Sequence, residues 1–201
     1  MRLTHYLILA GLITGLVLLC GCSSNMPAQA GQKENFTIML SGKMLQQTDL
    51  PAGFIISRQG ELATPEKVPQ LNNTGYQGGY DLTADHILSD GSQETVVQSI
   101  LVFKTTDPID LKKFFNEHYP QLTNHTVTAL TVSNLGDDCQ GYQYAVPKGS
   151  IASIPDTSVA GTLILIRKGN LVETVNVIGI NTAVNGSVAM NLAKVAEAKL
   201  T

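Results

Sequence analysis

The chain has 201 residues, of which 43% are hydrophobic and only 14% are charged, and its formal net charge is −3 at pH 7. This composition is too apolar for an intrinsically disordered polymer. The lack of a basic excess argues against nucleic acid as a partner, because neutralising phosphates requires a positive face. The length suits one globular domain with a short extension, since domains usually have about 100–200 residues.

The N-terminal region contains an uncharged apolar run from Tyr6 to Leu19, preceded by Arg2. As a helix, this run would reach about 21 Å, which is short of the ~30 Å hydrocarbon core of a bilayer. A short apolar run after a positive charge is typical of a secretory signal peptide rather than of a permanent membrane span.

The segment Leu19-Cys20-Gly21-Cys22 at the end of this run resembles the lipobox of bacterial and archaeal lipoproteins. Cys22 matches the cysteine of that motif, so the resemblance implies cleavage before Cys22 and attachment of palmitate-type acyl chains to the protein. An ordinary signal peptide or an uncleaved anchor is the alternative. We expect residues 1–21 to be the leader, residues 22–33 a flexible tether, and residues 34–201 a single extracytoplasmic domain held at the cell membrane.

Three cysteines are present, and only Cys139 remains once Cys20 is removed with the leader and Cys22 carries lipid. An intrachain disulfide is then excluded. The domain must rest on its apolar core, for which its length is sufficient.

The first part of the domain gives mixed signals. Residues 34–40 alternate weakly and predict either a strand or a short amphipathic segment. Residues 49–53 predict a turn, and residues 54–57 a short strand. The segment 60–79 is polar and rich in Pro, Asn and Gly, which predicts a surface excursion that ends in Gly-Tyr sequences.

Residues 95–103 are β-branched and apolar on both faces, as expected for an interior strand. A helix is expected next, with Asp107 as its N-cap and Pro108 at its first position. Its apolar residues recur with helical spacing and predict one buried stripe. The stripe comprises Leu111, Phe114, Phe115, His118, Tyr119 and Leu122. Pro120 is expected to mark the end of the helix.

The second half of the domain predicts four further strands, at 126–132, 140–146, 162–167 and 171–178, and a helix from about 187 to 200. Gly136 to Asp138 predicts a turn, residues 147–155 a loop, and Gly169-Asn170 a hairpin. The terminal helix is expected to present Val188, Leu192, Val195 and Lys199 on one side.

These elements indicate an α+β domain, in which an antiparallel sheet carries two packed helices. Each half is read as a Gly-Tyr strand, a long apolar strand and a helix, which suggests a duplicated β-β-α unit. The local echo between 77–80 and 140–142 supports the duplication, and coincidence of a common pattern is the alternative.

Several turns resemble those of poorly characterised prokaryotic extracytoplasmic lipoprotein domains of sensor or photosystem-accessory type. The resemblance rests on 45–54 (LQQTDLPAGF), Gly79-Tyr80, Gly136-Asp137 and 167–172 (RKGNLV). It spans most of residues 44–200, and it implies an α/β sandwich fold but does not point to a catalytic residue. Such domains commonly carry Ser where this chain has Cys139, so the resemblance does not indicate a nucleophile there.

The candidates for catalysis each have a simpler interpretation. Cys139 follows Asp137 and Asp138, whose charges would oppose formation of a thiolate, so an inert half-buried thiol is favoured. Adjacent carboxylates seldom converge on one substrate. Glu173 lies within an apolar strand and is expected to face water by alternation. The hydrolase motif G-x-S-x-G and the phosphate-binding glycine loops are absent from the sequence.

The expected domain contains three histidines without the spacing of a zinc site, and no metal or other cofactor is expected. His118 lies on the buried stripe, and His125 follows the helix. His86 lies among Asp81, Asp85 and Asp90, and this group lacks the spacing of a calcium loop. We therefore expect solvated turns there rather than a metal site.

Four Asn-X-Ser/Thr sequons are candidates for glycosylation in a host with that machinery. They are Asn35, Asn72, Asn124 and Asn185.

The sequence therefore predicts a membrane-anchored, non-catalytic binding or accessory protein whose partner is an envelope protein or a small ligand. Tyr76, Tyr80, Tyr142 and the loop 147–158 are the expected contact surface, because loops on a rigid sheet commonly carry recognition. The alternative for the tyrosines is packing of the sheet. The rival functions are a carrier of a small apolar ligand and an envelope enzyme using Cys139.

Overall fold

The computed structural model describes residues 39–62, 75–104, 107–151 and 153–200. The leader, Cys22, the tether, Asn35 and Asn72 lie outside the described residues. Within the described part of the chain, no helix is long and apolar enough to cross a bilayer.

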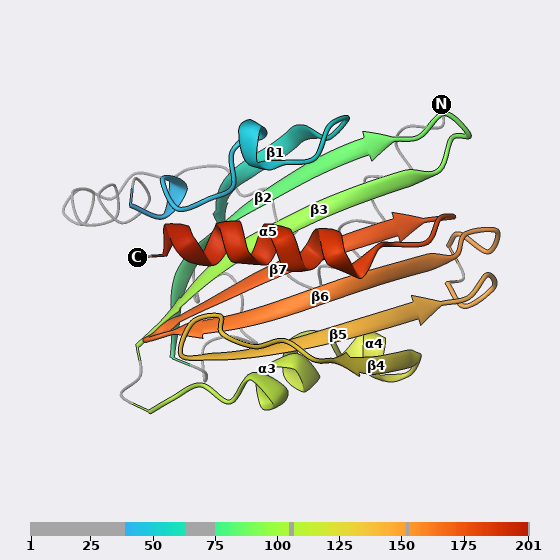
Figure 1. Ribbon diagram of the computed structural model, residues 1–201. Helices are drawn as coiled ribbons and strands as arrows, with labels where there is room; N and C mark the ends of the chain where they lie inside the picture. The colour runs from blue at the N-terminus through green and yellow to red at the C-terminus, as the bar shows by residue number, and fades with distance from the viewer. Residues whose placement is uncertain (1–38, 63–74, 105–106, 152, 201) are drawn as a thin grey trace, which may run out of the picture.

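Seven antiparallel strands form one sheet in the order β1-β2-β3-β7-β6-β5-β4 (Figure 1). The strands are β1 (Ile55–Leu62), β2 (Tyr76–Ile87), β3 (Gln93–Phe103), β4 (Thr126–Leu130), β5 (Asp138–Val146), β6 (Val159–Lys168) and β7 (Leu171–Ile180). The helical elements are η1 (Gln47–Asp49), α3 (Leu111–His118), α4 (Pro120–Thr123) and α5 (Gly186–Lys199). The predicted α+β class with two packed helices is confirmed.

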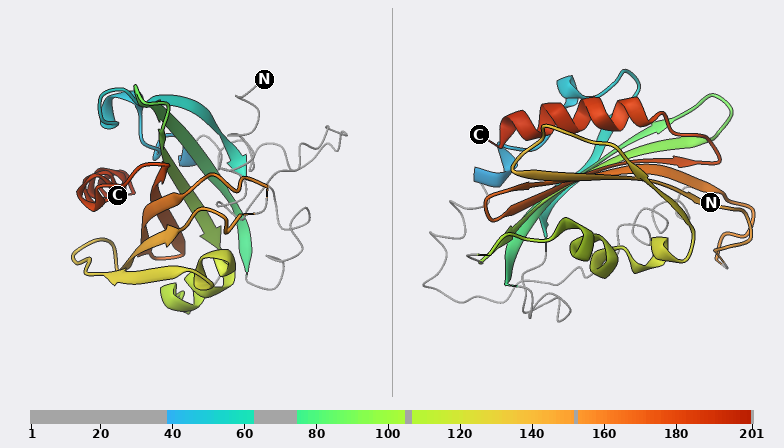
Figure 2. Two further views of the ribbon diagram at one scale, coloured as in Figure 1. Left: turned by 90° about the vertical axis from the view of Figure 1, so that its right-hand side faces the viewer. Right: turned by 60° about the horizontal axis from the view of Figure 1, so that its bottom comes forward.

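Helices cover both faces of the sheet. Figure 2 shows α5 on one side and α3 with α4 on the other, with the strands between them. Alternation along β3 divides its side chains between two cores: Val97 and Leu101 pack with α3, whereas Val96 and Ile100 pack with α5. We call these the α3 face and the α5 face.

The opposite placement of the two helices argues against a simple duplication. If the two halves were copies, a twofold rotation would exchange antiparallel neighbours such as β3 and β7. The axis of that rotation is perpendicular to the sheet, so the rotation does not exchange the two faces. Both helices would then lie on the same face. The halves also differ in strand content, because three strands precede α3 and four separate α4 from α5.

The prediction for residues 54–79 is wrong at both ends. The expected short strand extends to Leu62, and the expected excursion includes residues of β1 and the start of β2 at Tyr76. The polar sequence of β1 belongs to an edge strand that pairs only with β2. An edge strand tolerates polar residues because its outer side faces water.

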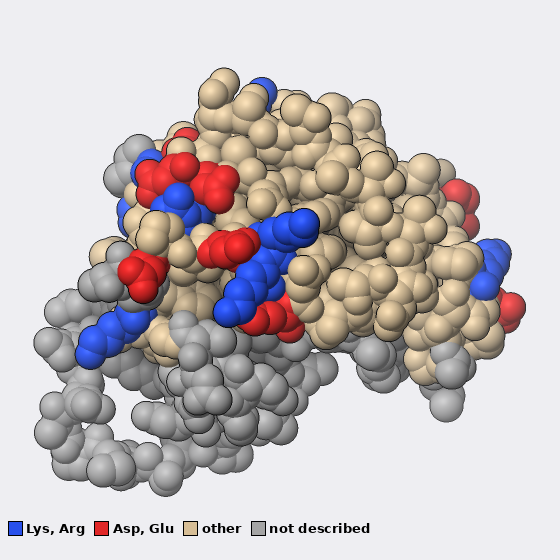
Figure 3. Space-filling model, turned by 90° about the horizontal axis from the view of Figure 1, so that it is seen from below, with Lys and Arg blue, Asp and Glu red and all other residues tan. Residues whose placement is uncertain are grey.

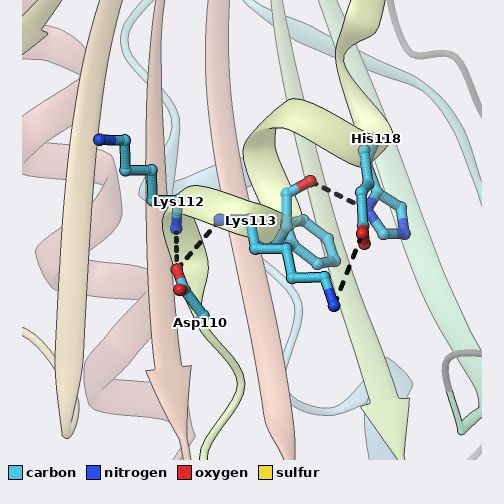
Figure 4. A network of polar contacts seen from close by, with 6 residues as sticks. Asp110, Lys112, Lys113 and His118 are labelled. Carbon is cyan, nitrogen blue, oxygen red and sulfur yellow. Dashed lines mark hydrogen bonds and ion pairs between the residues drawn. The ribbon is translucent and has the colours of Figure 1, made fainter.

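The start of α3 also differs from the prediction, because Asp110 rather than Asp107 is the N-cap. Its carboxylate accepts hydrogen bonds from the backbone N–H groups of Lys112 at 2.9 Å and Lys113 at 3.0 Å (Figure 4). Pro108 therefore precedes the helix, while Pro120 begins the short helix α4 after α3 ends at His118.

Helix α5 packs through small residues and through Leu192 of the predicted side, and Val188 of that side also contacts the core. The buried residues are Ala189, Leu192, Ala193 and Ala196, whereas the Val195 side chain is 38% exposed. Alanine allows the helix backbone to approach the sheet closely, and the helix is held at its end by ion pairs from Lys199 to Asp49 at 2.9 Å and from Lys168 to Glu197 at 3.1 Å.

Two strand glycines provide a matched test of this packing. A Cβ on Gly161 would overlap the ring of Tyr144, which is buried and donates a hydrogen bond to Asn176, whereas a Cβ on Gly60 would meet nothing within 4 Å. We expect Gly161→Ala to lower the free energy of unfolding by about 1–3 kcal/mol, with Gly60→Ala close to neutral. Chemical denaturation measures both, and equal stability of the two variants would contradict the described packing.

Candidate functional site

The α3 face contains a small cavity of about 30 Å³ between α3 and the sheet, which we call the α3 cavity. Its lining residues are Leu62, Asp81, Val97, Ser99, Leu101, Phe114, His118, Tyr119 and Thr174. The volume is sufficient for one or two water-sized groups. The lining combines apolar and aromatic side chains with polar groups that come from both the sheet and the helix.

The polar groups on the sheet side form a row across three neighbouring strands. Asp81 on β2 pairs with Ser99 on β3, and Ser99 pairs with Thr174 on β7. Directly paired residues of an antiparallel sheet point to the same face, so the three side chains lie together under α3.

Asp81 is buried and forms an ion pair with Arg58 of β1. Burial raises the pKa of the Asp81 carboxyl, against the opposing effect of the Arg58 guanidinium. The negative charge of Asp81 is therefore already balanced by Arg58 on the neighbouring strand.

His118 supplies the polar group on the helix side. Its Nδ1 lies 2.9 Å from the backbone oxygen of Phe114 (Figure 4), and a carbonyl oxygen only accepts, so Nδ1 carries the proton. Burial lowers the pKa of His118, which keeps the ring neutral near pH 7 and leaves Nε2 as an acceptor. This buried Nε2 has no hydrogen-bond partner among the residues that the structure describes.

The remaining polar atoms of the wall are paired or uncharged. Burial raises the pKa of Tyr119 to about 12, and the Thr174 hydroxyl forms a hydrogen bond with it. The ring of His118 stacks on Phe114 with a centroid distance of 4.0 Å, which fixes the imidazole plane at the edge of the cavity.

The opposite face of the sheet contains a second buried polar group, Glu173, which was expected to face water. That prediction is wrong, because α5 covers this part of β7 and the Glu173 side chain is 0% exposed. Its Oε1 accepts a hydrogen bond of 2.6 Å from Gln98, whose own oxygen accepts from the backbone N–H of Leu45. Burial raises the pKa of Glu173 to about 8, and its Oε2 has no hydrogen-bond partner within the described part of the chain.

The expected contact tyrosines lie in three different settings. Tyr76 is buried against Phe103, with a ring-centroid distance of 5.8 Å, so its ring packs the core. Tyr142 stacks on Phe115 of α3 at 3.9 Å and donates a hydrogen bond to Gln140. Tyr80 is half-buried on the α5 face. A binding role for Tyr80, for Tyr142 and for the loop 147–158 stays a prediction.

The acidic residues around His86 each bind different partners and do not surround a common point. Asp81 pairs with Arg58, Asp85 accepts from Ser57, Gln93 and Thr95, and Asp90 caps its own turn at Ser92. His86 lies near Glu94 and packs against Phe54. Among the described residues, no group of three or more His, Cys, Asp or Glu side chains is arranged to hold a metal ion.

Cys139 is half-buried and packs at the edge of the α5-face core. Asp137, which precedes it in the turn, accepts a hydrogen bond of 2.7 Å from the backbone N–H of Gly169 and lies 3.5 Å from Arg167. This carboxylate therefore ties the turn at Gly136 to the β6–β7 hairpin.

Two sequons lie within the described residues, and both are at helix ends. Asn124 is the C-cap of α4, and Asn185 is the N-cap of α5, where its side-chain oxygen accepts from the backbone N–H of Ser187. Their use as glycosylation sites stays a prediction.

The sequence contained a signal for the polar side chains that lie under the helices on the two faces of the sheet. Gln98 and Ser99 interrupt the apolar run of β3, and Glu173 and Thr174 interrupt that of β7. On strands covered on both faces, such interruptions indicate internal polar contacts rather than exposure.

Comparison with known proteins identifies no family. No family model matches the chain, and no curated protein matches it. Solved structures do align with it, among them the following two. The extracellular domain of PknH from Mycobacterium tuberculosis covers 80% of this chain and 95% of its own, with 16% identity and a TM-score of 0.45. LpqN, involved in cell envelope biogenesis of Mycobacterium tuberculosis, covers 74% and 78%, with 14% identity and a TM-score of 0.29. Likenesses of this extent carry no argument about function.

The buried carboxyl of Glu173 makes stability depend on pH. Its pKa is raised from 4.5 to about 8 in the folded protein, so the folded state binds more protons than the unfolded state between these values. The free energy of unfolding therefore falls as pH rises through this window, by up to ~1.4 kcal/mol per pH unit from this group.

Glu173→Gln, which keeps the hydrogen bond from Gln98 but does not ionise, should lack this part of the slope. Urea unfolding of both proteins at several pH values measures the difference. Parallel curves for wild type and variant would show that Glu173 ionises normally.

Proposed function

We propose that the chain is a lipid-anchored, extracytoplasmic protein with a non-catalytic binding role, in which the α3 cavity receives a polar group of a small ligand. The anchor is supported by the sequence of residues 6–22, where a short apolar run ends in a lipobox-like segment at Cys22. The tether of residues 22–33 would hold the domain away from the bilayer.

One observation carries the binding role, namely a partly polar cavity lined by Asp81, Ser99 and His118, whose buried Nε2 has no hydrogen-bond partner among the described residues. Leaving a buried acceptor unpaired costs about 1–3 kcal/mol, so a hydrogen-bond donor entering the cavity regains this energy.

The two rival functions have less support from the described residues. The α3 cavity is too small for an acyl chain, which disfavours it as the site of an apolar carrier. An enzyme using Cys139 would need a base beside the thiol, and the contacts described for Cys139 are with the apolar core of the α5 face.

The anchor is tested by Cys22→Ser in the native host, with Cys20→Ser as the matched control. We expect wild type and Cys20→Ser to fractionate with membranes and to carry the added mass of acyl chains on the mature N-terminus. Cys22→Ser should lose the acyl mass and leave the membrane fraction. Retention of acyl mass by Cys22→Ser would contradict the anchor.

The non-catalytic role is tested by the reactivity of Cys139 towards a thiol probe at neutral pH. We expect slow labelling of the folded protein and fast labelling after denaturation, because the thiol is packed against apolar side chains. Labelling of the folded protein as fast as that of a free thiol peptide would instead support the enzyme.

A further inference from the structure

A chain of hydrogen bonds joins the centre of the sheet to residues 39–50, which we call the entry segment. Glu173 Oε1 on β7 accepts from Gln98 Nε2 at 2.6 Å, and Gln98 Oε1 accepts from the backbone N–H of Leu45 at 2.7 Å. A backbone N–H donates and cannot accept, so Leu45 fixes the orientation of the Gln98 amide. Glu173 Oε1 must then accept, and the proton of the neutral acid is on Oε2.

The surroundings of Glu173 oppose a negative charge. Its side chain is 0% exposed, and among the described residues its Oε2 has no hydrogen-bond partner. Burial raises the pKa of Glu173 to about 8. By contrast, the acidic and basic side chains on the face shown in Figure 3 lie at the surface, where water stabilises their charged forms. Ionisation of Glu173 at a lower pH therefore requires water to reach its carboxylate.

The charged groups near Glu173 are already paired with one another. Besides burial, Glu197 of α5 acts to raise the pKa of Glu173 and Lys168 of β6 acts to lower it, and these two side chains form an ion pair at 3.1 Å. On the entry segment, Asp49 is paired with Lys199 at 2.9 Å. Burial acts to raise the pKa of Asp49, but hydrogen bonds such as that from Lys199 lower it overall, so this carboxyl stays ionised above pH 5.

Two elements cover this part of the sheet, namely α5 and the entry segment, which lies beside the C-terminal end of α5 (Figure 1). They are joined where Lys43 Nζ donates to the backbone oxygen of Lys199 at 3.2 Å. Helix α5 is continuous over 14 residues, whereas the entry segment contains no strand and η1 within it has three residues. A segment with few regular backbone hydrogen bonds opens at a lower cost in free energy than a packed helix. We therefore expect the entry segment to open first.

We propose that Glu173 and Gln98 form a proton-dependent latch, which holds the entry segment on the sheet while the carboxyl is protonated and releases it when the proton is lost. Release lets water reach the carboxylate and leaves α5 and the sheet folded. The pKa of the carboxyl is about 8 in the closed state and near its usual 4.5 when water reaches it. The equilibrium constant for opening should therefore rise by up to tenfold per pH unit between these values and level off above them. The latch lies on the α5 face and does not depend on the binding role proposed for the α3 cavity.

The test is amide hydrogen exchange followed by NMR from pH 5 to pH 8, in the wild type and in Glu173→Gln. The glutamine keeps an acceptor for Gln98 but does not ionise, and a comparison at equal pH cancels the chemical exchange rate. We expect the ratio of the Leu45 exchange rates, wild type over variant, to rise with pH by up to tenfold per unit. In the wild type, Leu45 should exchange faster than amides in the middle of α5 at each pH. Glu197→Gln, which removes a neighbouring carboxyl and keeps Glu173, should retain the rise.

His86 is the other titratable group close to the entry segment, since it packs against Phe54 and lies 3.5 Å from Glu94. It is present in both variants, so a rise that disappears in Glu173→Gln cannot come from it. The same pH dependence in the wild type and Glu173→Gln, or loss of the rise in Glu197→Gln, would overturn the latch. Equal exchange rates of Leu45 and the α5 amides in the wild type would also overturn it, because the whole domain would then open at once.

Discussion

Coverage of the central strands on both faces is the constraint on which the rest of the structure depends. β3, β6 and β7 lie between α3 and α5, and most side chains along the middle of these strands are buried. A polar group there must find a partner inside the protein or remain unsatisfied at a substantial cost in free energy. Most of them do find one: Gln98 binds Glu173, Asn176 accepts from Tyr144, and Thr174 binds Tyr119.

The network on the α5 face joins the first described segment to the centre of the sheet. The backbone N–H of Leu45 donates to Gln98 at 2.7 Å, and Asp49 is paired with Lys199 at the end of α5. The described segment that begins at residue 39 is therefore held to the sheet and to the end of α5.

The α3 face differs because a cavity lies between the polar groups of the sheet and those of the helix. Asp81, Ser99 and Thr174 lie in one row on the sheet, and His118 faces them from the helix, but a cavity separates the two sides. The Nε2 of His118 is one of several buried polar atoms, Oε2 of Glu173 among them, that lack a hydrogen-bond partner among the described residues, and His118 is the one of these residues that lines the α3 cavity. This is the physical reason for placing a ligand group there.

Local patterns in the sequence predicted most of the elements but not their relative placement. The interior strand at 95–103, the hairpin at Gly169-Asn170 and the stripe of α3 follow from periodicity and turn chemistry, and all are present. The strand β1 was underestimated because its polar residues look like a loop, and Glu173 was misplaced because the sequence of one strand does not reveal what covers it. The α3 cavity depends on which strands are neighbours, and no local pattern contains that information.

A high-resolution crystal structure of the protein tests the central claim most directly. We expect density for a water molecule or a ligand hydroxyl in the α3 cavity, about 2.7–3.2 Å from His118 Nε2, with Nδ1 still directed at the Phe114 carbonyl. An empty cavity, or an imidazole flipped so that Nε2 faces Phe114, would contradict the account of this face as a place where a donor binds.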